Sequence, residues 1–74
     1  MWTRKVEVGK AYRHFKGFTV RVLAVAKHTE TNEMMVVYSC KDGVYYARPL
    51  DMFLSKVDRE KYPEAKQEYR FELL

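Results

Sequence analysis

The sequence predicts a mostly β fold, a small SH3-like five-stranded antiparallel barrel with a short helical turn before the last strand. Five short segments rich in β-branched and aromatic residues occur within 74 residues. The pair Asp42-Gly43 is a strong hairpin-turn signal between two of them. No stretch of twelve or more residues has the apolar period of a helix, which disfavours a ferredoxin-like α+β fold.

The first two strands are expected at residues 9–15 and 18–28, on either side of a break at Lys16-Gly17. The second strand begins with alternating apolar and polar residues, which is typical of a strand with one exposed face. Residues 22–26 are apolar on both faces, so we expect this part to be buried on both sides. Such a strand fits a bent strand that crosses a small barrel.

The next two strands are expected to form a hairpin. Residues 28–33 have a turn composition, residues 34–40 form a third strand, and residues 44–48 form its return strand. Pro49 ends the return strand, because proline has no N–H to donate to the ladder.

After Pro49 the pattern changes to one helical turn and then a charged segment. Residues 50–54 are expected to form the turn, with Met52 and Phe53 packed into the end of the barrel. Residues 55–69 are highly charged, and Pro63 limits any helix there to a short C-terminal helix. Residues 70–74 alternate and are expected to form the last strand.

The length allows one domain. We expect a single SH3-like β domain at residues 9–74, preceded by an N-terminal extension at residues 1–8. A chain of this size buries about 60% of its unfolded surface and is too small to enclose a deep substrate cavity. Edge strands in so small a barrel invite pairing, so we expect a monomer or a weak homodimer.

Basic residues are concentrated in the first half of the chain. Residues 1–29 contain seven basic residues and one acidic residue, a net charge of +6, whereas residues 30–74 have a net charge of −2. This asymmetry favours an anionic partner.

The composition excludes several other classes. The single cysteine, Cys40, cannot form an internal disulfide framework and favours a reducing, cytoplasmic location. No apolar run approaches the roughly 20 residues needed to span a bilayer, so no membrane partner is expected. One cysteine and two histidines cannot build a zinc cluster, and no metal or other cofactor is expected.

Five groups of residues along the chain together carry a resemblance to a known family. They are Gly9, Tyr12 and residues 14–17, then residues 25–31, then residues 35–38, then residues 48–50 with Met52 and Phe53, and finally Arg70 and Phe71. The set resembles the small bacterial domain-of-unknown-function family 1653 from Gly9 to Glu72, nearly the whole chain. The resemblance implies a compact bacterial cytosolic β-domain and no particular activity.

The sharpest local feature is the stretch from Tyr12 to Gly17, which holds two aromatic rings, an imidazole and an ammonium group. Lys16 offers a charge to a phosphate or carboxylate, and Tyr12 or Phe15 offers a stacking face. Gly17 lets the backbone turn or approach a ligand closely. The alternative interpretation is structural: His14 hydrogen-bonds to the backbone at the barrel end, and Phe15 packs in the core.

A second candidate site follows the long strand at His28, Thr29 and Glu30. In the functional interpretation the Glu30 carboxylate orients the His28 imidazole, as in general acid–base sites. In the structural one these residues build a turn. A metal site formed by His14, His28 and Glu30 would have only the minimum number of ligands.

Arg48 is a third candidate. In SH3-like barrels the proline and helical turn after the fourth strand flank a groove formed with the first loop, and by that analogy Arg48 faces the surface of His14 and Lys16. The alternative is that Arg48 pairs with Asp51 or Glu30.

The hairpin is rich in tyrosine. Tyr45 and Tyr46 are adjacent and point to opposite faces of the sheet, so only one of them can line the core. The other is exposed, where it stacks on a ring or shields the sheet.

These observations favour a binding module with a basic, aromatic-edged groove for a nucleotide-like, anionic or peptide ligand, or for a protein partner. Its candidate ligand-binding residues are Tyr12, His14, Phe15, Lys16, His28, Thr29, Glu30, Tyr46 and Arg48. The alternative is a nucleic-acid-binding domain for RNA or single strands, which would use the basic first half and exposed aromatic rings. An enzyme with His14 or His28 as the acid–base is less favoured, because a nucleophile, a Gly-rich phosphate cradle and a carboxylate pair are missing.

Overall fold

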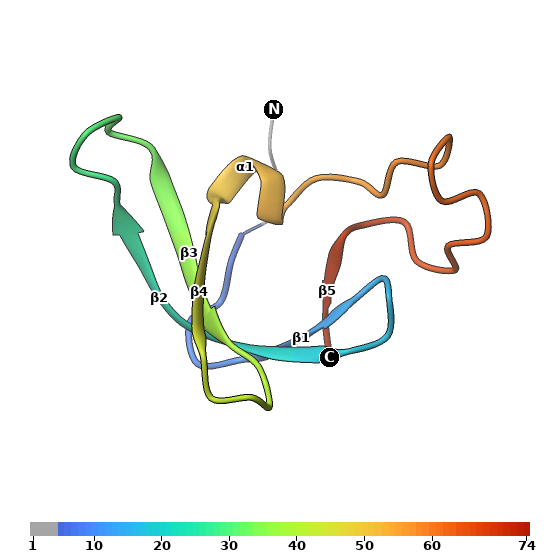
Figure 1. Cartoon of the computed structure of the whole chain (residues 1–74), viewed down its shortest axis with the longest axis horizontal. Helices are drawn as coiled ribbons and strands as arrows, with labels where there is room; N and C mark the ends of the chain where they lie inside the picture. The colour runs from blue at the N-terminus through green and yellow to red at the C-terminus, as the bar shows by residue number, and fades with distance from the viewer. Residues whose placement is uncertain (1–4) are drawn as a thin grey trace.

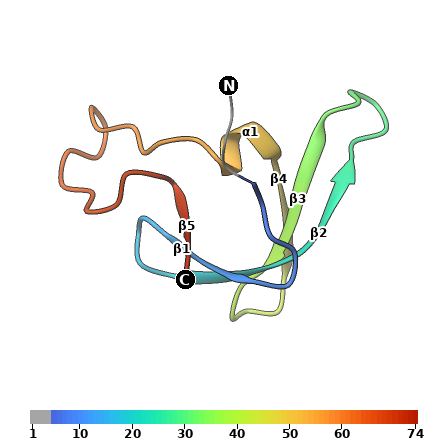
Figure 2. The same cartoon turned by 180° about the vertical axis from the view of Figure 1, so that it is seen from behind.

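The computed structural model describes residues 5–74 as one antiparallel sheet and a single helical turn. The elements are β1 (Ala11–His14), β2 (Thr19–Lys27), β3 (Met34–Ser39), β4 (Tyr45–Pro49), α1 (Leu50–Phe53) and β5 (Phe71–Leu73). The strand order is β4-β3-β2-β1-β5, as Figures 1 and 2 show from opposite sides. The predicted mostly β class, with five antiparallel strands and a helical turn, is therefore confirmed.

The strand β2 bends where it passes from one half of the sheet to the other. Its first residues pair with β1, and the register with β3 shifts between Val22 and Ala24, which leaves Leu23 as a bulge. The bend gives the sheet its strong curvature (Figure 1). The sheet is nevertheless open: within residues 5–74, β4 and β5 are its two edges and do not pair with each other.

The expectation that residues 22–26 are buried on both faces is wrong. Val22 is fully buried, but Ala24 and Ala26 are exposed and Val25 is half-buried. Beyond the bulge, β2 pairs only with β3, and the two strands project as an arm (Figure 1). Nothing in the described chain covers the outer face of this arm, so its small alanine side chains face solvent.

The core lies on the concave side of the sheet, under α1. Its buried residues are Tyr12, Val20, Val22, Val36, Tyr38, Phe53, Leu54 and Phe71. Phe53 and Phe71 stack with their ring centroids 4.2 Å apart, and the Tyr12 ring meets Phe53 edge-on at 5.3 Å. The expectation for Phe53 is confirmed, whereas that for Met52 is wrong, because Met52 is 45% exposed on the outer side of the turn.

The connection from α1 to β5 contains turns and no helix, so the expected short C-terminal helix is wrong. The Asp58 carboxylate accepts the N–H of Glu60 and so caps a single turn, which does not continue because Pro63 lacks an N–H. Gln67 ties the segment to β1 by donating its amide N–H to the Arg13 carbonyl.

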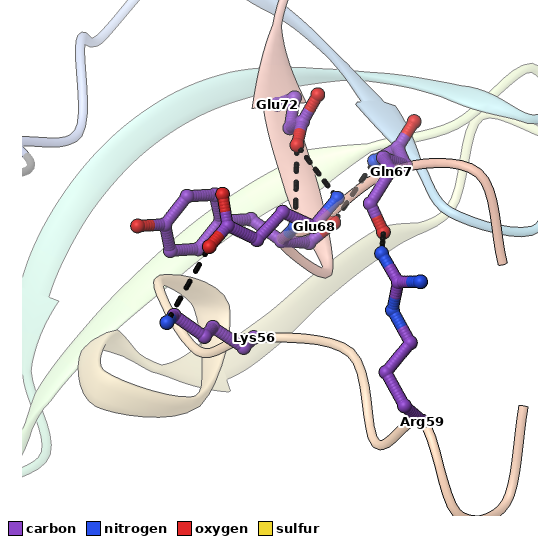
Figure 3. Close-up of polar contacts among 6 residues, drawn as sticks. Lys56, Arg59, Gln67, Glu68 and Glu72 are labelled. Carbon is purple, nitrogen blue, oxygen red and sulfur yellow. Dashed lines mark hydrogen bonds and ion pairs between the residues drawn. The ribbon is translucent and has the colours of Figure 1, made fainter. Parts of the chain in front are cut away.

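The last part of this connection folds back onto its beginning and onto β5. Glu72 accepts the backbone N–H groups of Glu68 and Tyr69, and Glu68 forms an ion pair with Lys56 (Figure 3). Arg59 donates to the Gln67 carbonyl (Figure 3). Polar contacts therefore hold a charged segment in place without regular secondary structure.

The residues before β1 also contact the core. Val6 packs against it, and the Glu7 N–H donates to the Tyr12 hydroxyl at 2.9 Å. The predicted N-terminal extension at residues 1–8 thus includes core contacts, while its residues 1–4 lie outside the described residues. No helix in residues 5–74 has the length and apolar character needed to cross a membrane.

Replacing Phe53 by alanine should reduce the free energy of unfolding by about 3–5 kcal/mol, because it removes a fully buried ring and leaves a cavity. The neighbouring substitution Met52→Ala is the matched control and should cost less than about 1 kcal/mol, because Met52 is largely exposed. Urea unfolding followed by circular dichroism measures both. Equal losses for the two variants would contradict this description of the core.

Candidate functional site

His14, at the end of β1, is the centre of the candidate site. It is only 5% exposed, and its Nδ1 accepts the backbone N–H of Lys16 at 3.1 Å. Gly17 follows with a φ of +102°, a conformation that favours glycine, and donates its N–H to the His14 carbonyl at 2.8 Å. The turn between β1 and β2 is therefore built on the imidazole and the backbone of His14.

Three aromatic rings surround the imidazole. Phe18 stacks on it almost parallel, with centroids 4.4 Å apart and planes 10° apart. Phe71 meets it edge-on at 4.9 Å, and Phe15 lies tilted against it at 4.5 Å. Phe18 is nevertheless 45% exposed, because only one of its faces is covered by the imidazole.

The surroundings keep His14 uncharged. Burial lowers its pKa to about 4, and the positive charges of Arg48, Arg70 and Lys16 add to this effect in that order. The imidazole is therefore neutral at pH 7. Among residues 5–74, no carboxylate contributes to the shift in the His14 pKa.

The two arginines lie half-buried beside the core. The Arg48 guanidinium lies 5.6 Å from the Phe71 ring centroid, and its Nε donates to the Tyr38 hydroxyl at 3.4 Å. The Arg70 Nε donates to the Ser55 hydroxyl at 3.4 Å. Within the described part of the chain, neither arginine forms an ion pair, so the alternative pairing of Arg48 with Asp51 or Glu30 is not found.

We call this group of residues the His14 surface: His14, Lys16, Phe18, Arg48 and Arg70. The structure brings three predicted residues, His14, Lys16 and Arg48, into it. The sequence did not indicate Arg70 or Phe18 as site residues, and Phe18 was expected only as the first residue of the second strand. The signal that could have revealed Phe18 is its position directly after Gly17, at a turn, where one face of a ring often remains open.

A hollow of about 420 Å³ lies beside the His14 surface. Its lining residues are Lys16, Gly17, Phe18, Thr19 and Lys41. Lys41 belongs to the turn between β3 and β4, so the hollow joins two turns that are distant in the sequence. Among the residues that the structure describes, no acidic residue lines it, and Lys41 was not among the predicted site residues.

Tyr12 and Phe15 lie outside the His14 surface, and they differ in exposure. Tyr12 is only 2% exposed, so its ring belongs to the core and presents no face to a ligand. Phe15 is half-buried and lies against Tyr62, with centroids 4.9 Å apart. The ammonium groups of Lys16 and Lys61 lie 5.2 and 5.6 Å from the Tyr62 ring centroid, above a second hollow of about 330 Å³.

Tyr46 is held on the hairpin. Its ring stacks on Tyr38 with centroids 5.7 Å apart, and its hydroxyl donates to the Asp42 carboxylate. This hydrogen bond raises the pKa of Tyr46 to about 12. The Tyr38 hydroxyl also accepts a hydrogen bond from Arg48. Tyr38 therefore lies between Tyr46 and the His14 surface.

The second candidate site lies elsewhere. His28, Thr29 and Glu30 are exposed at the tip of the arm formed by β2 and β3, whereas His14 precedes the opposite end of β2 (Figure 1). The His28 Nδ1 accepts the backbone N–H groups of Glu30 and Thr31, which is the contact of a turn. The structure therefore does not bring His14 together with His28 and Glu30. In residues 5–74, no three side chains of the metal-ligating types cluster.

The buried His14 should make stability depend on pH. Its folded-state pKa, about 4, lies below the ordinary value of 6.5, so the unfolded state takes up the proton first as the pH falls. The contribution of neutral His14 to the free energy of unfolding is complete above about pH 6.5 and is lost toward about pH 4. The free energy of unfolding should change by at most about 1.4 kcal/mol per pH unit in this range. Urea unfolding between pH 5 and 6.5 should show this slope, and His14→Gln should remove most of it. The same slope in both proteins would contradict an uncharged, buried imidazole.

Comparison with known proteins identifies the family of the chain. Searches among curated proteins and among solved structures give no match. The family described as "Protein of unknown function (DUF1653)" matches residues 10–73, which confirms the resemblance recognised from the sequence. The match extends from the residue before β1 to the end of β5 and includes the whole His14 surface. The chain therefore belongs to the family of proteins of unknown function DUF1653.

Proposed function

We propose that this protein is a non-catalytic binding module that holds an anionic ligand on the His14 surface. The observation that carries the proposal is the group of three cations, Lys16, Arg48 and Arg70, around an uncharged imidazole. Within residues 5–74 no carboxylate pairs with any of them. Unpaired cations next to the low-dielectric core raise the local positive potential and so attract an anion. The attraction between these charges is stronger there than it would be in bulk water.

The state of His14 supports binding rather than catalysis. Its Nδ1 already accepts the Lys16 N–H, its ring lies between Phe18 and Phe71, and its pKa of about 4 makes it a weak base at neutral pH. His28 lies at the far end of β2 and contributes nothing to this site.

The arrangement of strands supports an SH3-like relationship as part of the same proposal. The order β4-β3-β2-β1-β5, the bent β2 and the helical turn directly after β4 are the features expected of an SH3-like domain. In such domains a ligand lies between the first loop and the segment around the helical turn. The His14 surface occupies the corresponding place, because Lys16 and Phe18 belong to the first turn and Arg48 precedes α1.

An anion should be detected most directly by NMR with pyrophosphate as the probe. The amide signals of Lys16, Gly17 and Phe18 should shift on titration, and the binding should weaken with added salt because the site is partly exposed. Lys16→Gln should weaken pyrophosphate binding about 3- to 10-fold, through loss of one charge-assisted contact.

The matched control is Lys27→Gln, which removes the same charge from an exposed residue at the other end of β2. It should leave the affinity within about twofold of the unchanged protein, because charges beyond a Debye length are screened. Equal weakening by both substitutions would show only the effect of net charge and would contradict a site at the His14 surface. The absence of amide shifts at low salt would contradict the proposed function itself.

A further inference from the structure

Phe18 forms a rigid platform with one free face. Its ring lies parallel to the His14 imidazole at 4.4 Å, which fixes its orientation, while 45% of the residue remains exposed. The Phe18 ring rests on a buried imidazole that itself accepts a backbone hydrogen bond. A fixed aromatic face costs little conformational entropy when a second flat ring stacks on it.

Two lysines line the hollow next to this platform. Lys16 and Lys41 approach it from the turn between β1 and β2 and from the turn between β3 and β4. Thr19 adds a hydroxyl group, and within residues 5–74 no acidic side chain lines the hollow. Its volume of about 420 Å³ lies in the range of small-molecule sites.

We infer that the hollow binds a nucleotide unit, with the base stacked on Phe18 and the phosphate held by Lys16 and Lys41. The inference rests on the proposed function, which requires an anion but no ring. Stacking on an aromatic side chain is available to every base, because each base has a π face. The lysines can hold a phosphate as point charges without a fixed hydrogen-bond geometry. A free nucleotide and a single-stranded nucleic acid both supply this unit.

The decisive comparison uses two probes that share the sugar and the phosphate. Adenosine monophosphate carries a base and ribose 5-phosphate does not, so the difference between their dissociation constants measures the contribution of the ring. NMR titration should give at least a fivefold tighter constant for adenosine monophosphate. The base protons should shift upfield, as they do above an aromatic face.

A single-stranded adenylate octamer, titrated in parallel, distinguishes the two sources of the nucleotide unit. Binding more than tenfold tighter than that of the mononucleotide would assign the unit to a strand. Equal binding would assign it to a free nucleotide.

Substitutions at Phe18 test the platform. Phe18→Leu should weaken adenosine monophosphate binding by about 5- to 100-fold and should remove most of the difference between its dissociation constant and that of ribose 5-phosphate. Phe18→Trp, which keeps a ring and guards against a mere loss of packing on His14, should retain the tighter binding. Tyr45→Leu is the matched control, because Tyr45 is 72% exposed on β4 and does not line the hollow.

The outcomes separate this inference from the proposed function. If pyrophosphate binds but adenosine monophosphate binds no more tightly than ribose 5-phosphate, the nucleotide inference is overturned and the anion site stands. Failure of all of these probes at low salt overturns both. Binding of phosphotyrosine, with none of adenosine monophosphate, also overturns the inference in favour of a phosphorylated peptide.

Discussion

The packing of one uncharged imidazole among aromatic rings is the constraint on which the rest of this structure depends. His14 meets the edge of Phe71, carries Phe18 on its face, and accepts the N–H that begins the turn after β1. Phe71 in turn stacks on Phe53 of α1. This series of contacts joins β1, β5, α1 and the first turn, and it requires a neutral ring, because a buried imidazolium beside three cations would be strongly destabilised.

The open sheet explains why positive charge gathers at this place. Since β4 and β5 do not pair, the chain between them must cross from one edge of the sheet to the other (Figure 2). Arg70 is the last residue of this connection, and Arg48 lies near the end of β4 with its guanidinium 5.6 Å from the ring centroid of the buried Phe71. Two nearby carboxylates are engaged elsewhere: Glu68 of the connection pairs with Lys56, and Glu72 of β5 accepts backbone N–H groups (Figure 3). The connection therefore supplies Arg70 to the His14 surface, whereas the contacts of Glu68 and Glu72 stabilise the fold of the connection itself.

Local sequence patterns predicted the positions of the strands better than they predicted which residues are buried. The alternation before Val22 and the Asp-Gly turn are short-range signals, and the strands they predicted are present with nearly the predicted bounds. The burial of residues 22–26 was not predictable, because it depends on how far β1 extends along β2. The pairing with β1 ends at Arg21, just before the bulge at Leu23. The short helix considered before β5 is absent because Pro63 lacks an N–H and because Glu72 of β5 accepts the N–H groups of Glu68 and Tyr69.

The candidate site was predicted in part for the same physical reason. His14 and Lys16 are neighbours in the sequence, so their association could be anticipated, and the relation to Arg48 required only the analogy with SH3-like domains. The exposed face of Phe18 and the approach of Arg70 and Lys41 depend on tertiary packing, which cannot be predicted from the spacing of residues along the chain. Conversely, the pairing of His28 with Glu30 looked plausible from spacing and is replaced by a turn in which the imidazole caps backbone N–H groups.

The most direct test of this account is the pKa of His14, measured by NMR in the free protein and again with saturating pyrophosphate. The account predicts a pKa of about 4 in the free protein, because the ring is buried beside Arg48, Arg70 and Lys16. An anion bound among these cations would offset their charge, so pyrophosphate should raise the pKa of His14. A value near 6.5 in the free protein would contradict the buried neutral imidazole. A pKa that pyrophosphate leaves unchanged would contradict an anion site at the His14 surface.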